Sequence, residues 1–119
     1  MDTSAAFGEL TAKLGTGKPA FILAELNDLL TACAGERFES LPAPSISDAY
    51  LANYVAAMVE LAAYKQGVRP PAWTSGIAPL SEPVFAVPWQ SLRAHLLTAS
   101  PVPFRRRNIF IDSSIGPRV

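Results

Sequence analysis

Apolar residues recur at spacings of three and four near the start of the chain, the pattern of an amphipathic helix. Phe7, Leu10 and Leu14 form the first such stripe, and a glycine-containing turn ends it. A second stripe lies between Pro19, whose missing N–H suits a first helical turn, and Gly35, which suits the position just past a helix end. The apolar residues of this second stripe are Ile22, Leu23, Leu26, Leu29, Leu30 and Cys33. Both segments are predicted to be helices that lie on a core.

The longest helical pattern runs from an N-cap at Ser47 to Gly67. Large apolar side chains cover nearly half of its circumference, and alanines cover another arc where a neighbouring helix could approach closely. Asn53 and Glu60 make its one clear polar strip. We therefore expect this helix to be central and the most buried. Its large apolar residues are Tyr50, Leu51, Tyr54, Val55, Met58, Leu61 and Tyr64.

The second half of the chain is rich in proline. Residues 68–88 form a connection of about 20 residues, a length that is unusual in a compact domain and is usually functional or disordered. Trp73 and its apolar neighbours indicate that this crossover is pinned to the core. Pro88 is predicted to open a fourth helix, and the run Ile109-Phe110-Ile111 is predicted to be a short edge strand or a strapped extended segment.

These patterns predict a single domain spanning residues 1–119 that is mostly all-α. It has about four main helices, a long proline-rich crossover and an extended basic C-terminal segment. Half of the residues are hydrophobic and 17% are charged, which is too apolar a composition for a disordered chain.

Localisation follows from what the sequence lacks. It has no run of about 18 uninterrupted apolar residues and no secretory leader pattern, so we expect a cytoplasmic protein that does not bind a membrane. Cys33 is the only cysteine and cannot form an internal disulfide, which fits a reducing compartment.

Candidate chemistry is sparse. A single histidine, His95, excludes a multi-histidine metal site and leaves at most one imidazole for acid–base work. Cys33 lies on an apolar stripe, where packing is the favoured interpretation. Gly15-Thr16-Gly17-Lys18 lacks the spacing of a phosphate-binding loop and follows a helix rather than a strand. We therefore expect no enzyme activity, no metal and no cofactor.

The distribution of charge singles out the C-terminal end. Net charge is zero, yet residues 1–92 hold nine acidic against five basic side chains, and residues 93–119 hold five arginines against Asp112. Three of these arginines are consecutive at positions 105–107. Three adjacent guanidiniums cannot all be buried cheaply, and some must meet carboxylates, phosphates or backbone carbonyls. They could dock an acidic partner or nucleic acid, or they could anchor the segment to helix ends and to the acidic surface of residues 1–92.

Two motifs carry a resemblance. Pro71-Ala72-Trp73-Thr74 and Phe104-Arg105-Arg106-Arg107-Asn108-Ile109-Phe110-Ile111 resemble a P-A-W-T loop and an F-R-R-R-x-x-F-(I/V) ending in a group of small uncharacterised bacterial proteins. Some members of that group are fused to a helix-turn-helix or encoded beside nucleotidyltransferase-like toxins.

The resemblance implies a non-enzymatic bacterial interaction protein of the antitoxin-like kind. It would bind a protein partner encoded nearby, such as a toxin. The alternative is a small nucleic-acid-binding accessory or regulatory protein that uses the patch Arg105–Arg107. The residues expected to contact a partner are Trp73, Arg93, Arg105, Arg106 and Arg107.

Overall fold

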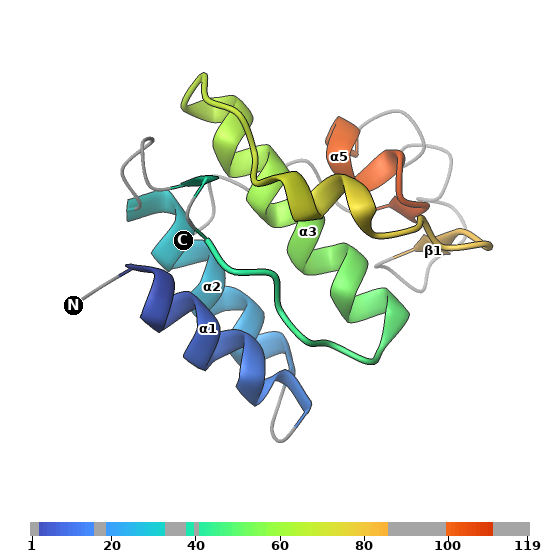
Figure 1. The fold of residues 1–119 in the computed structure, drawn as a ribbon. Helices are drawn as coiled ribbons and strands as arrows, with labels where there is room; N and C mark the ends of the chain where they lie inside the picture. Colours follow the sequence, from blue (N-terminus) through green and yellow to red (C-terminus); the bar gives the residue numbers. More distant parts are fainter. Residues whose placement is uncertain (1–2, 16–18, 33–37, 40, 86–99, 111–119) are drawn as a thin grey trace.

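The computed structural model describes residues 3–15, 19–32, 38–39, 41–85 and 100–110, and through these residues the chain is mostly α-helical, as the sequence predicts (Figure 1). The long elements are helices α1 (Thr3–Ala12), α2 (Pro19–Ala32) and α3 (Ala49–Lys65). The predicted fourth helix that opens at Pro88 lies outside the described residues.

Helices α1 and α2 pack against each other, and α2 also packs on α3 (Figure 1). The 3-10 turn η1 (Lys13–Gly15) follows α1 directly. The predicted stripes form the contact: Phe7 and Leu14 from the first segment are buried with Ile22, Leu26 and Leu30 from α2. These side chains belong to one hydrophobic cluster.

Helix α3 is the central element, as its apolar pattern predicts. It begins after Asp48 rather than after the predicted cap Ser47, because the Asp48 carboxylate accepts a hydrogen bond from the N–H of Leu51 at 2.9 Å. It ends before Gly67, whose φ of 70° lies in the left-handed region that a glycine adopts without strain. Its buried residues are Asn53, Tyr54, Val55, Ala56, Ala57, Met58, Val59, Glu60 and Ala63.

The proline-rich crossover contains structure of its own. A 3-10 turn, η3 (Ala72–Gly76), packs on α3. Strand β1 (Val84–Phe85) then pairs in parallel with β2 (Ile109–Phe110), with Val84 opposite Ile109. The predicted strand in the C-terminal segment therefore forms, and the crossover supplies its partner.

The C-terminal segment reaches β2 through a short helix, α5 (Val102–Arg105). Pro101 is its N-cap and Pro103 lies in its first turn, where backbone N–H groups have no intrahelical acceptor. Phe104 is buried edge-on against Tyr54 of α3, with ring centroids 5.1 Å apart. Helix α3 thus has the pair α1 and α2 on one side and α5 on the other (Figure 1).

Candidate functional site

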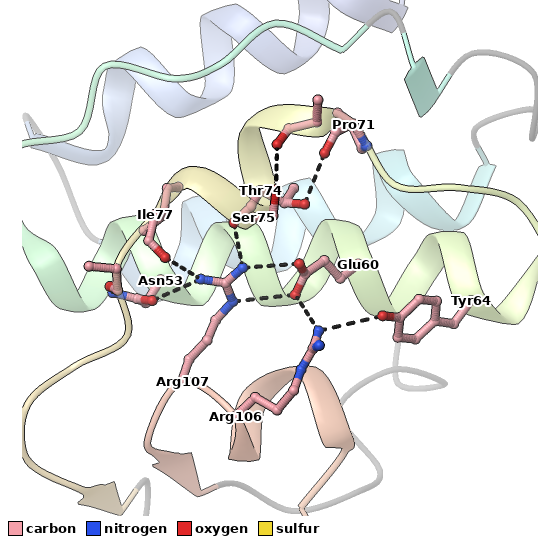
Figure 2. Close-up of polar contacts among 11 residues, drawn as sticks. Asn53, Glu60, Tyr64, Pro71, Thr74, Ser75, Ile77, Arg106 and Arg107 are labelled. Carbon is pink, nitrogen blue, oxygen red and sulfur yellow. Dashed lines mark hydrogen bonds and ion pairs between the residues drawn. The ribbon is translucent and has the colours of Figure 1, made fainter.

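The third arginine of the motif lies inside the protein. Arg107 is 5% exposed, and its guanidinium is surrounded by acceptors from α3 and from the η3 region (Figure 2). Nε and Nη2 donate to the two carboxylate oxygens of Glu60 at 3.3 and 3.0 Å. Nη1 donates to Asn53 Oδ1 at 3.0 Å and to the carbonyl of Ile77 at 3.3 Å. Nη2 also donates to the carbonyl of Thr74 at 2.7 Å. The five N–H groups of the Arg107 guanidinium therefore have five hydrogen bonds to acceptors in the protein.

The helix pattern explains why these acceptors converge. Asn53 and Glu60 are seven residues apart, about two helical turns, so both point from the same side of α3. The Asn53 amide nitrogen donates to the carbonyls of Ala49 and Ala78, which leaves its oxygen free to accept from Arg107. Across the part of the chain that the structure describes, every buried side-chain polar atom has a hydrogen-bond partner.

Asn108 turns the chain so that Arg107 points inward. Its φ of 65° is left-handed, a conformation that asparagine tolerates better than most residues. Its side-chain amide donates to the carbonyl of Leu80 at 2.6 Å, and its own carbonyl accepts from the N–H of Val84 at 2.7 Å. The crossover and the C-terminal segment are thus joined by two hydrogen bonds at the residue just before β2.

Trp73 is held by contacts with residues from the first half of the chain. Its Nε1–H donates to the carbonyl of Leu41 at 2.9 Å, and its ring centroid lies 6.1 Å from that of Phe7 in α1. The adjacent residue, Thr74, provides the carbonyl that Arg107 binds. The P-A-W-T loop and the F-R-R-R ending therefore meet at the contact between Thr74 and Arg107, and Trp73 is partly buried against the hydrophobic cluster.

Arg106 faces outward. Its side chain is 55% exposed, and Nη2 lies 3.4 Å from Glu60 Oε1 and 3.4 Å from the hydroxyl of Tyr64 (Figure 2). Val102 lies on the same side of α5, one helical turn before Arg106, which donates its backbone N–H to the Val102 carbonyl. Tyr64 and Val102 are each 49% exposed, and Arg105, the last residue of α5, is half-buried. We call Tyr64, Val102, Arg105 and Arg106 the α3–α5 face.

The α3–α5 face carries surplus positive charge. Arg106 and Arg107 share the single carboxylate of Glu60, and Arg105 makes no ion pair with any residue that the structure describes. One guanidinium is neutralised inside the protein, and the others leave a positive field at the surface next to exposed apolar side chains.

The predicted site residues thus separate. Arg107 is buried, Trp73 and Arg105 are partly buried, Arg106 is exposed, and Arg93 is outside the described residues. Sequence reasoning identified the polar strip of α3 without assigning its partner. A helix that is apolar nearly all round, with two polar residues seven apart, is itself the signal of a buried polar network.

Within the described ranges, no three side chains of His, Cys, Asp or Glu lie close enough together to hold a metal ion. The same part of the chain contains no helix of the length and apolar character needed to cross a membrane. The Glu60 carboxylate is buried and bound by two arginines. What remains at the surface is suited to recognition of negative charge.

Comparison with family models, curated proteins and solved structures finds no match to this chain.

Proposed function

We propose that this chain is a non-enzymatic bacterial interaction protein, of the antitoxin-like kind, that binds a protein partner encoded nearby through its α3–α5 face. The observation that carries the proposal is the position of Arg106. Its side chain is 55% exposed, its guanidinium lies 3.4 Å from the hydroxyl of exposed Tyr64, and it follows exposed Val102 by one helical turn. Tyrosine and arginine are enriched among the residues that dominate protein–protein binding energy. A surplus of positive charge there would attract an acidic surface and speed its association.

The nucleic-acid alternative has weaker support. Phosphate binding uses several accessible cations, and Arg107, the third arginine of the patch, is buried with its donors occupied. Arg106 already lies beside Glu60. With at most Arg105 and Arg106 engaged, log affinity for duplex DNA would fall with log salt at a slope near −2, since each phosphate contact contributes about −0.9.

The test is co-expression with the product of the adjacent gene, followed by co-purification and titration calorimetry. Val102→Asp and Arg106→Gln should each weaken binding about tenfold or more, because both change the centre of the α3–α5 face. Glu39→Gln, an exposed change on neither α3 nor α5, should leave affinity unchanged.

All three variants should melt within a few degrees of wild type, because surface substitutions usually change stability by less than about 0.5 kcal/mol. Binding that is indifferent to both face variants would rule out this surface. Tight duplex binding with the salt slope given above would favour the nucleic-acid alternative instead.

A further inference from the structure

A second exposed face lies on α2. Phe21 is 64% exposed, the most exposed of the large hydrophobic residues that the structure describes. Glu25 and Asp28 follow it by four and seven residues, and at 100° per residue both point within about 40° of it. Both carboxylates are exposed, and neither forms an ion pair within the described part of the chain. We call Phe21, Ala24, Glu25 and Asp28 the α2 face.

The charged residues of the α2 face are all acidic. Pro19–Ala32 contains no lysine or arginine, so nothing on this helix offsets Glu25 and Asp28. Ala24 is exposed and small, which leaves the Phe21 ring standing above its surroundings. An exposed aromatic ring beside carboxylates is the complement of the α3–α5 face, where Tyr64 and Val102 lie beside surplus arginines.

The helices that carry Phe21 and Val102 lie on different sides of α3. Helix α2 packs on one side of α3 and α5 packs on the other (Figure 1). One copy therefore cannot bring its own α2 face onto its own α3–α5 face. The three most exposed large hydrophobic residues of the described chain, Phe21, Tyr64 and Val102, are divided between these two faces.

We infer that the protein associates with itself head to tail, the α2 face of one copy docking on the α3–α5 face of the next. Phe21 packs between Val102 and Tyr64. Glu25 and Asp28 form ion pairs with the arginines whose charge Glu60 does not neutralise. Such a heterologous contact extends into short chains or closes into a ring, because each copy keeps one face of each kind. The faces are small, so the association is weak and reversible, and salt weakens it further.

This inference shares only the α3–α5 face with the proposed function. The α2 face is used in self-association alone, so the two ideas fail separately. It also predicts that a protein partner bound at the α3–α5 face competes with self-association.

The experiment is sedimentation of the purified chain over a concentration series up to the millimolar range at low salt. Wild type should show a weight-average sedimentation coefficient that rises with concentration and falls back when salt is added. Phe21→Ser removes the aromatic ring of the α2 face, and Val102→Asp places a negative charge on the α3–α5 face. Each should weaken association at least about tenfold. Glu39→Gln is the control and should associate like wild type.

Mixing the two variants gives the decisive result. Phe21→Ser keeps an intact α3–α5 face and Val102→Asp keeps an intact α2 face, so the mixture should form one-to-one pairs and nothing larger. Both positions are exposed, and an acidic residue at the first position of a helix is favourable, so each variant should fold. A wild type that stays monomeric throughout would overturn the inference. So would association that Phe21→Ser leaves unchanged, or a mixture of the two variants that remains monomeric.

Discussion

Replacing Arg107 by alanine tests the buried network most directly. The change would leave the Glu60 carboxylate, 4% exposed, with only Arg106 at 3.4 Å. Asn53 Oδ1 and the carbonyls of Thr74 and Ile77 would each lose the hydrogen-bond donor that Arg107 provides. Removing one partner of a buried ion pair typically costs about 3–5 kcal/mol, because the other charge stays behind. Since a whole domain is stable by only about 5–15 kcal/mol, this variant should be close to unfolding at 37 °C.

The measurement is urea and thermal denaturation of Arg107→Ala beside Arg105→Ala. For a chain of this length, 3–5 kcal/mol lowers the melting temperature on the order of 10–20 °C. Arg105→Ala should shift it by a few degrees at most, because that guanidinium has no ion pair in the described structure. Arg107→Lys should fall between them, since an ammonium has three donors and cannot reproduce the planar fork. Equal melting temperatures for Arg107→Ala and Arg105→Ala would refute the role assigned to this network.

Further predictions concern individual contacts. Trp73→Phe should cost about 1–2 kcal/mol in urea unfolding, because the Leu41 carbonyl loses its donor, and an unchanged midpoint would contradict this. Asp48→Ala should cost about 1 kcal/mol through loss of the helix cap, whereas Asp48→Asn should cost less. Gly67→Ala should cost about 1 kcal/mol because alanine is strained at a φ of 70°. Burial, with a smaller effect of Asp48, raises the pKa of Tyr50 above 10.0, so folding favours its neutral form. Stability should therefore be insensitive to this group below about pH 10 and fall as the pH rises above it, a fall that Tyr50→Phe should reduce.

Much of the helical architecture could be predicted from the sequence. The start of α2 at Pro19, the stripes that bury Phe7 and Leu26, and the central position of α3 all follow from apolar spacing and helix-end signals. Tyr64 was assigned to the apolar arc of α3, yet it is 49% exposed, because it lies in the last turn of the helix, where the chain turns back into the crossover.

The site was harder to predict because it depends on contacts between distant residues. The periodicity of α3 shows that Asn53 and Glu60 share one side, but it cannot show which of three consecutive arginines meets them. That choice is made by the left-handed turn at Asn108 and by the position of α5. Likewise, the crossover supplies the carbonyls of Thr74 and Ile77 only because η3 packs on α3.

The partnership of Glu60 with Arg107 also governs the order in which the protein can fold. The two residues are 47 positions apart, so during synthesis the central helix emerges long before the guanidinium that neutralises its carboxylate. Until residue 107 has left the ribosome, burying α3 would bury an unpaired charge, a penalty of several kcal/mol. The nascent chain can pair α1 with α2 through local contacts, whereas α3 must stay partly hydrated. A ribosome-bound chain that stops short of Arg107 should therefore be readily cut by protease within α3.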